Sequence, residues 1–212
     1  MNTKEFKNGA LSATTGSLWW GLLGTYFFQY IAFAGTLEVV VHRCIWTSFF
    51  LLITTTILKK WYLFKKILIN KKNFFILFVT SFLIFGNWST WIYAVSTNRI
   101  IDASYGYFIF PILSVFFGYL FLNEKLNKKR IFAILIVICS SIYLSFNLIS
   151  FPWVGIVVAV LWSTYNLLRK LINVETDIGL FIESLFILPI ALIIFYFIVQ
   201  KGLNDFSLSS PK

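Results

Sequence analysis

Long apolar runs separated by short polar segments dominate the 212-residue chain. A membrane-crossing helix needs about 20 largely apolar residues, because each residue rises about 1.5 Å along the helix axis. The uncharged run from Ile131 to Leu168 is too long for one crossing, and Ser150 and Pro152 mark a turn that divides it. The pattern predicts seven spans, near residues 17–35, 38–58, 74–95, 103–122, 131–148, 153–171 and 179–200. We therefore expect an all-α fold, a polytopic transmembrane helical bundle.

The composition agrees with a surface that faces lipid. Hydrophobic residues make up 59% of the chain and charged residues 12%, whereas a soluble domain has roughly a quarter of its residues charged. The formal charge of +10 comes from Lys and Arg in the gaps between apolar runs. That placement is typical of orientation signals and not of a nucleic-acid-binding surface. We expect the lipid bilayer, and not nucleic acid, as the partner.

The basic residues also predict how the spans are oriented. With the N-terminus in the cytoplasm, the cytoplasmic segments contain Lys4, Lys7, Lys59, Lys60, Lys65, Lys66, Lys71, Lys72, Lys125, Lys128, Lys129, Arg130, Arg169 and Lys170. The opposite side contains Arg43, Arg99, Lys201 and Lys212. Under the positive-inside rule, this asymmetry predicts a multi-pass protein of the bacterial inner membrane with a cytoplasmic N-terminus.

Arg43, Glu183 and His42 lie inside predicted spans, several residues from either end, where each of them opposes insertion and must face protein or water. Arg43 either holds an anionic group of a substrate or a gate carboxylate in a central cavity, or extends to the outer headgroups. Glu183 is a proton-titrating site, a cation contact, the ion-pair partner of a basic residue, or a hydrogen-bonded carboxylate at the end of its span. His42 either relays a proton or is a hydrogen-bonded packing residue.

Aromatic and amide side chains share helical spacing in three further spans. They are Asn87, Trp88, Trp91, Tyr107, Trp162 and Tyr165. The span that contains Tyr107 also carries Gly106 and Pro111, which can interrupt a regular helix. Such faces form either the walls of a substrate cavity near the bilayer midplane or interfacial aromatic belts. We interpret Arg169 and Lys170, at the end of the sixth span, as a cytoplasmic anchor.

The sequence lacks the residues that several kinds of catalytic and metal-binding chemistry require. The sequence has no G-x-x-x-x-G-K-[ST] loop, so it does not hydrolyse nucleotides by that route. With a single His and no paired carboxylates, we expect neither a catalytic nor a metal site, and no cofactor. Cys44 and Cys139 lie inside apolar runs and predict no disulfide framework.

A faint internal repeat appears when Trp20 is aligned with Trp162, because the next span then places Arg43 close to Glu183. If the repeat unit contains five helices, an odd number, the second copy enters the membrane in the opposite direction.

Several sequence blocks also occur in a characteristic order. They are Trp20-Gly21 with Tyr26, Glu38, His42-Arg43 with Trp46-Thr47, Gly86-Asn87-Trp88, Ala94-Val95, Ala103-Ser104, Gly106-Tyr107-Phe108 with Pro111, Glu124, Tyr165, Arg169-Lys170, Ile182-Glu183 and Leu188-Pro189. In these blocks the chain resembles the RarD-type proteins of the drug/metabolite transporter (EamA) superfamily, from about Gly9 to Phe197.

The resemblance implies a ten-helix transporter made of two inverted five-helix repeats, with a central cavity and alternating access. Residues 9–148 would form the first repeat, 149–200 the first two helices of a second, truncated repeat, and 201–212 a polar tail. The chain departs from the family pattern at Gly24, Phe28 and Phe110, where relatives often carry Pro, Lys and Asn. These departures affect residues that would lie in or near the cavity.

The sequence and the resemblance together predict a secondary transporter of small organic metabolites or drugs. The expected substrate-binding residues are Tyr26, His42, Arg43, Trp46, Asn87, Trp88, Trp91, Tyr107, Trp162, Tyr165 and Glu183. The expected substrate is amphipathic or amino-acid-like, with an anionic group oriented by Arg43. One alternative is a truncated, non-transporting membrane component whose open faces are covered by a second copy or by missing helices. A third reading, an intramembrane enzyme, needs a catalytic cluster that the sequence does not contain.

Overall fold

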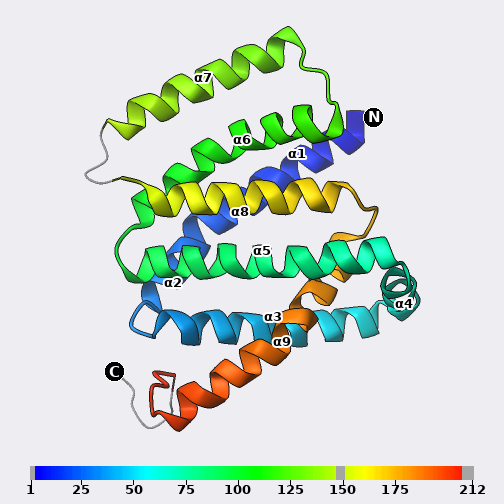
Figure 1. Ribbon diagram of the computed structural model, residues 1–212, viewed down its shortest axis with the longest axis vertical. Helices are drawn as coiled ribbons and strands as arrows, with labels where there is room; N and C mark the ends of the chain where they lie inside the picture. Colours follow the sequence, from blue (N-terminus) through cyan, green and yellow to red (C-terminus); the bar gives the residue numbers. More distant parts are fainter. Residues whose placement is uncertain (1–2, 147–150, 207–212) are drawn as a thin grey trace.

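The apolar runs fold into a bundle of helices (Figure 1). The computed structural model describes residues 3–146 and 151–206, and in these ranges it contains no strand. The helices are α1 (Thr3–Leu18), the π-helical η1 (Trp19–Gly24), α2 (Thr25–Tyr30), α3 (Thr36–Ile57), α4 (Trp61–Ile69), α5 (Lys71–Ser96), α6 (Ile100–Leu122), α7 (Lys128–Ser145), α8 (Trp153–Lys170) and α9 (Thr176–Gln200). From the second predicted span onward, the predicted and observed bounds agree to within three residues. The all-helical fold class is therefore confirmed.

Within the described residues, four helices are long and apolar enough to cross a membrane: α3, α5, α6 and α9. The first predicted span lies in a helical stretch that begins at Thr3, well before residue 17, and changes to π-helix at η1. α7 and α8 have 18 residues each, and basic residues occupy the first turn of α7 and the last turn of α8. Seven crossings therefore remain a prediction. The predicted turn between α7 and α8 falls largely on residues 147–150, outside the described residues.

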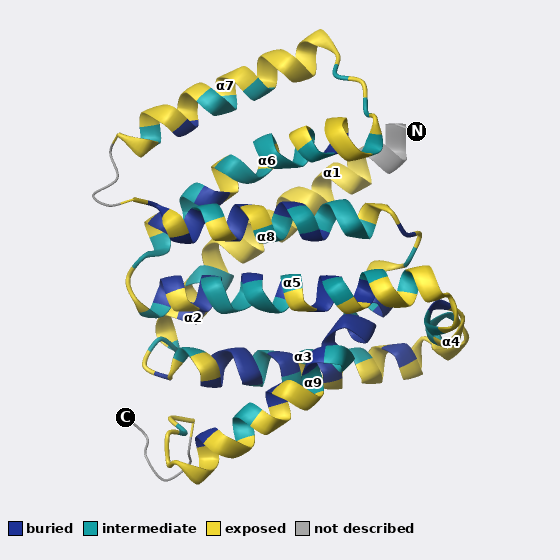
Figure 2. Ribbon diagram, viewed as in Figure 1, coloured by how far each residue is buried: buried dark blue, intermediate teal, exposed yellow. Residues whose placement is uncertain are grey.

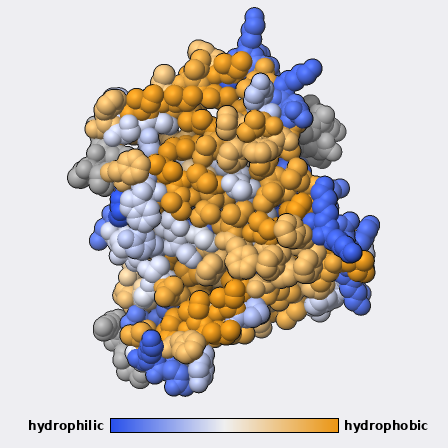
Figure 3. Space-filling view, viewed as in Figure 1, coloured by the Kyte–Doolittle hydropathy of each residue, from blue (hydrophilic) through white to orange (hydrophobic). Residues whose placement is uncertain are grey.

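The long helices run in alternate directions, so their connections gather at two ends of the bundle (Figure 1). One end contains the start of α1, the short helix α4, the α6–α7 connection and the α8–α9 connection. We call it the basic end, because these are the segments in which the sequence concentrates Lys and Arg. In Figure 3, hydrophobic atoms cover the middle of the molecule and hydrophilic atoms gather beside α4 and near the C-terminus.

Helix α8 lies between α6 and α5, and α9 packs against α3 and α5. On α8, the small residues Gly155, Ala159 and Ser163 recur every fourth position, and Ser163 Oγ donates to the Phe110 carbonyl of α6 at 3.4 Å. Small residues at this spacing allow two helices in a membrane to approach closely. The buried residues concentrate on α3, α5, α8 and α9, whereas α1 and α7 are largely exposed (Figure 2).

Asparagine side chains define several helix boundaries. Asn70 Oδ1 accepts from the Asn73 N–H at 3.1 Å at the start of α5, and Asn127 Oδ1 accepts from the Arg130 N–H at 2.8 Å at the start of α7. These bonds satisfy N–H groups that have no partner inside the helix. Asn123 ends α6 with a φ of 52°, in the left-handed region that Asn tolerates better than most residues.

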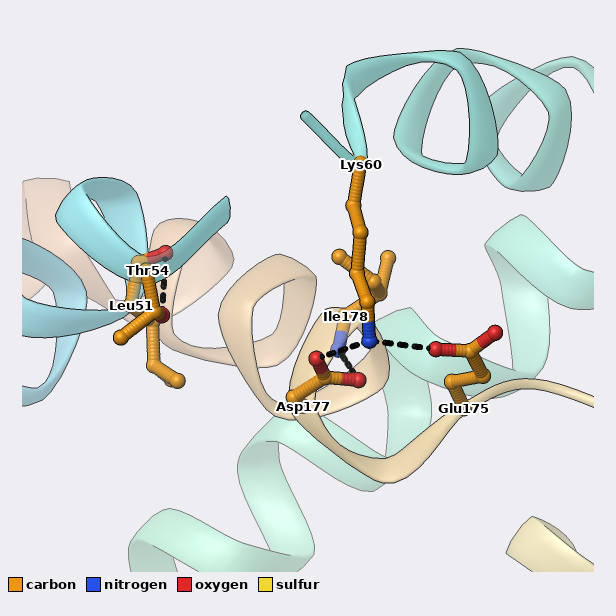
Figure 4. A network of polar contacts seen from close by, with 6 residues as sticks. All are labelled: Leu51, Thr54, Lys60, Glu175, Asp177 and Ile178. Atoms are coloured by element: carbon orange, nitrogen blue, oxygen red, sulfur yellow. Dashed lines mark hydrogen bonds and ion pairs between the residues drawn. The ribbon is translucent and has the colours of Figure 1, made fainter. Parts of the chain in front are cut away.

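An ion-pair network at the basic end joins the connection between α3 and α4 to the start of α9 (Figure 4). Lys60 Nζ lies 2.6 Å from Asp177 Oδ2 and 2.6 Å from Glu175 Oε2. Hydrogen bonds to Asp177 and then to Glu175 raise the pKa of Lys60 to about 12. At the same end, Lys170 of α8 pairs with Glu124, and this hydrogen bond holds the pKa of Glu124 below its ordinary range. The network fixes the ends of α8 and α9 relative to their neighbours.

The described part of the predicted polar tail, residues 201–206, folds back onto α3. The Asp205 and Phe206 N–H groups donate to the buried Glu38 carboxylate at 2.8 and 3.2 Å, and the Gly35 N–H donates to Asp205 Oδ2 at 3.0 Å. These residues are therefore part of the packed structure. Residues 207–212 lie outside the described residues.

Candidate functional site

Five helical elements converge on a cavity of about 270 Å³, which we call the aromatic cavity. It is lined by Trp20 of η1, Arg43 of α3, Asn87, Trp88 and Trp91 of α5, Tyr107 of α6 and Trp162 of α8. Both α6 and α8 reach it because Gly106 and Gly155 let their backbones touch, and a Cβ on either glycine would overlap the backbone of the other helix. The apolar faces of the indole rings thus surround a small number of polar groups.

Among the described residues that line the aromatic cavity, Arg43 is the one cation. Its guanidinium carbon lies 4.1 Å from the ring centroid of Trp88, 5.5 Å from that of Phe28 and 5.6 Å from that of Trp20. Each close cation–π contact contributes about 0.5–2 kcal/mol, more when water is excluded. Arg43 Nη1 is buried without a hydrogen-bond partner, and no carboxylate in residues 3–146 and 151–206 forms an ion pair with it. The aromatic rings hold the cation, and its hydrogen-bonding capacity stays largely unused.

Two further polar groups belong to the wall of this cavity. Asn87 Nδ2 donates to the Val158 carbonyl of α8 at 3.2 Å, so its amide is oriented by the neighbouring helix. Trp91 is 5% exposed and its Nε1–H is buried without a partner. The Trp91 ring meets Tyr107 edge-on, with centroids 5.7 Å apart and an interplanar angle of 75°. Unused donors at Arg43 and Trp91 make the cavity suited to an acceptor such as a carboxylate.

A larger cavity of about 790 Å³ adjoins the first, and Arg43 lines both. We call it the apolar cavity, since its walls are mostly Phe, Leu, Ile and Val side chains, together with His42 and Trp46 of α3. The His42 ring lies edge-on between Phe195 and Phe206, with centroids 5.2 and 5.3 Å away. His42 Nε2 is 3.8 Å from Glu38 Oε1.

Glu183 of α9 lies in a separate buried cluster and is 0% exposed. Its Oε1 accepts from Thr80 Oγ1 of α5 at 2.6 Å, and its Oε2 accepts from the Tyr165 hydroxyl of α8 at 3.1 Å. Arg169 Nε lies 3.7 Å from Glu183 Oε1, and the Arg169 side chain is only 11% exposed. Our interpretation of Arg169 as only a surface anchor was therefore wrong: it is the basic partner of the buried carboxylate. The Tyr165 ring stacks on the Trp162 ring, with centroids 5.2 Å apart and an interplanar angle of 9°. This contact connects the Glu183 cluster to the aromatic cavity.

The structure brings most of the predicted site residues together. Six of them line the aromatic cavity: Arg43, Asn87, Trp88, Trp91, Tyr107 and Trp162. His42 and Trp46 line the apolar cavity, and Tyr165 with Glu183 forms the cluster behind Trp162. Tyr26 is 69% exposed and lines neither cavity.

Sequence reasoning missed three contributors to these sites. Trp20 entered only through the family blocks and the repeat, yet it lines the aromatic cavity. Phe28 lies against Arg43, at the position where relatives often carry Lys. Thr80 is a polar residue in the middle of the apolar run of α5 and hydrogen-bonds Glu183, so its place in that run was the available signal.

Comparisons with known proteins agree with a membrane transporter. A family model described as the EamA-like transporter family matches residues 7–146. The chain is 31% identical to "Protein RarD" of Escherichia coli (strain K12) over 99% of the chain and 72% of that protein. It is 33% identical to an "Uncharacterized transporter" of Vibrio cholerae serotype O1 over 98% of the chain and 68% of that protein. With "Uncharacterized transporter YojE" of Bacillus subtilis (strain 168), the identity is 34% over 91% of the chain and 65% of that protein. No solved structure matches the chain.

Proposed function

Because the chain belongs to the EamA-like transporter family, in its RarD-type branch, we propose that it is a secondary transporter of small organic anions. Transport proceeds by alternating access, in the inner membrane of a bacterium, with the basic end in the cytoplasm. Residues 9–148 form the first of two related helical repeats, and 149–200 belong to the second. The anionic group of the substrate binds at Arg43, and its apolar part lies among the tryptophan rings.

The state of Arg43 is the observation that carries this proposal. A buried guanidinium has five N–H donors, and aromatic faces satisfy its charge but accept few of its hydrogen bonds. Arg43 Nη1 has no hydrogen-bond partner, and the cation lies in the wall of a cavity. An arriving carboxylate would accept two parallel N–H bonds from such a group. An acceptor with negative charge would therefore satisfy the donor that the protein leaves unpaired.

The dimensions of the two cavities support a small, partly apolar substrate. Sites for small molecules typically measure about 300–1,000 Å³ and are mostly apolar with a few placed polar groups. The aromatic cavity, at about 270 Å³, suits a molecule of amino-acid size. The adjoining apolar cavity, at about 790 Å³, accommodates a longer apolar portion of a substrate. Arg43 lines both spaces, so a single anionic group there can serve substrates that extend into either.

Flux into vesicles that contain the full chain tests the proposal. We expect uptake of aromatic or branched carboxylates, such as phenylalanine or phenylpyruvate, to exceed uptake of the corresponding amides, which lack the carboxylate. Arg43→Ala should abolish the flux, and Arg43→Lys should restore only part of it, because a lysine cannot bind a carboxylate bidentately. Arg130→Ala is the matched control, since Arg130 is 58% exposed at the basic end and lines neither cavity.

The control experiment also requires that the variants fold. Arg43→Ala should elute as a monodisperse species in detergent and retain the helical circular-dichroism spectrum of the wild type. Unchanged flux in Arg43→Ala, or equal uptake of amides and carboxylates, would remove Arg43 from the substrate site and refute the proposal.

A further inference from the structure

The hydrogen bonds around Glu183 can satisfy its carboxyl group in either protonation state. Thr80 Oγ1 donates to Glu183 Oε1 at 2.6 Å, and the Leu77 carbonyl, at 3.2 Å, is a second acceptor within reach of the same hydroxyl. A hydroxyl can accept one hydrogen bond while it donates another. If Glu183 gains a proton, its O–H can donate to Thr80 Oγ1 while the Thr80 hydroxyl donates to Leu77. The hydrogen bonds of the carboxyl group and of the Thr80 hydroxyl can thus be satisfied in both protonation states.

The ion pair with Arg169, by contrast, is incomplete. Arg169 Nε and Glu183 Oε1 are 3.7 Å apart, too far for a hydrogen bond, and Arg169 Nη1 is buried without a partner. The guanidinium lies against Gly179, where any Cβ would overlap it. A buried cation in this position depends on the negative charge of Glu183, since removal of one partner of a buried pair is strongly destabilising.

Two other cations at the basic end have carboxylate partners of their own. Lys60, on the connection that follows α3, pairs with Glu175 and Asp177 at the start of α9. Lys170, next to Arg169, pairs with Glu124. From α5 the facing group is the Thr80 hydroxyl, and from α8 the facing groups are Tyr165 and Arg169. Within the described residues, Arg169 is thus the cation that responds to the charge on Glu183.

Protonation of Glu183 would also reach the wall of the aromatic cavity. The Tyr165 hydroxyl donates to Glu183 Oε2, and the Tyr165 ring stacks on Trp162, which lines that cavity. A change in the charge or position of the carboxyl group therefore alters the group that orients Tyr165. Arg169 lies in the last turn of α8, so it can leave for water at the basic end once its counter-charge is gone.

We propose that Glu183 is a proton-binding site that links proton uptake to opening of the basic end of the aromatic cavity. One proton binds to a Glu183 carboxylate oxygen, Arg169 remains charged and moves outward, and Tyr165 and Trp162 shift with it. This inference rests on the proposed transport function only for its consequence, which is flux driven by a proton gradient. Proton binding itself can be measured without a substrate.

Infrared difference spectroscopy of the full chain in liposomes, recorded as the pH is lowered, gives the direct test. We expect a C=O band of a protonated, buried carboxylic acid to appear in the wild type and to be lost in Glu183→Gln. Glu175→Gln is the matched control, because Glu175 is a 54%-exposed carboxylate at the same end, and it should retain the band. Tryptophan fluorescence should change over the same pH interval, and this change should be lost in Glu183→Gln.

Tyr165→Phe provides a second variant that keeps the ring stacked on Trp162 but removes the hydroxyl. We expect Tyr165→Phe to retain the infrared band, with a shifted pH midpoint for its appearance. The tryptophan fluorescence should no longer change over the pH interval in which the band appears. Absence of the band in the wild type, or its persistence in Glu183→Gln, would overturn the inference. If the protein lacks the band but transports carboxylates independently of a pH gradient, the transport proposal stands and the proton-site inference fails. The band without any flux would refute transport and leave the proton site.

Discussion

The contact between α6 and α8 provides the sharpest test of how the aromatic cavity is built. A Cβ on Gly155 would overlap the Asp102 carbonyl oxygen and would lie 2.9 Å from the Gly106 nitrogen. These are backbone atoms, so no side-chain rotation can relieve the overlap. Gly155→Ala must therefore push the two helices apart at the level of Gly106, next to Tyr107.

The magnitude follows from two opposing effects. Overpacking of this kind destabilises a core by about 1–3 kcal/mol. Replacement of a helical glycine by alanine returns about 0.5–1 kcal/mol, because the unfolded chain loses less entropy on folding. The expected net loss is about 1–2 kcal/mol, equivalent to roughly a 5- to 30-fold change in the ratio of folded to unfolded protein. Gly16→Ala in α1, where nothing lies within 4 Å of the added Cβ, should instead be neutral or slightly stabilising.

Reversible unfolding in mixed micelles with increasing SDS, followed by circular dichroism, measures both variants. The Gly155→Ala midpoint should fall below that of the wild type, while the Gly16→Ala midpoint should equal or exceed it. Carboxylate flux should also decrease in Gly155→Ala, because the cavity walls on α6 and α8 move. Equal midpoints for the two variants would mean that α6 and α8 do not touch at Gly155, and the geometry of the aromatic cavity would have to be abandoned.

Three further predictions concern the basic end. Gly179→Ala should lower the free energy of unfolding by about 1–3 kcal/mol in the same SDS titration, because its methyl group overlaps the Arg169 guanidinium; stability equal to the wild type would contradict the contact. Since the pKa of Glu124 is lowered by its pairing with Lys170, its contribution to stability is present above the ordinary Glu value of 4.5 and is lost as the pH falls through the lowered folded-state value. A pH series should therefore show a decline in the wild type that Glu124→Gln lacks. Lys60→Met should cause a small loss of stability that shrinks at about 1 M salt, where exposed ion pairs are screened; a loss independent of salt would argue for packing instead of charge.

The positions of the long helices could be predicted from the sequence because apolar run length is a direct requirement of the bilayer. Asn70 and Asn127 also act as local start signals, since their side chains cap the helices that follow. The helix before residue 17 was harder to predict, because its polar residues do not form the apolar run of a membrane span and its described side chains are exposed. The helical α4 was also missed: its lysines dominate the pattern, but Trp61 and Phe64 pack on Phe181 of α9.

The composition of the aromatic cavity was predictable because a polar or amide group in an apolar run is itself a signal. Arg43 and Asn87 stand out in this way, and Trp88, Trp91 and Trp162 follow by helical spacing, whereas Trp20 does not. Pairing between helices was not predictable, since it depends on which faces meet. Glu38 bonds a segment 167 residues away, and nothing in the local sequence of either segment indicates this contact.

Arg43 and Glu183 are stabilised in different ways, and the difference assigns them different roles. Arg43 is surrounded by aromatic faces that attract its charge but leave an N–H unpaired, so the position favours a ligand with a negative charge. Glu183 is surrounded by two hydroxyls and a cation, which satisfy the carboxylate without any ligand. A substrate would therefore gain more at Arg43 than at Glu183, and a proton more at Glu183. The stacked pair of Trp162 and Tyr165 lies between the two charges, so the aromatic contact in α8 is the element through which one site can sense the other.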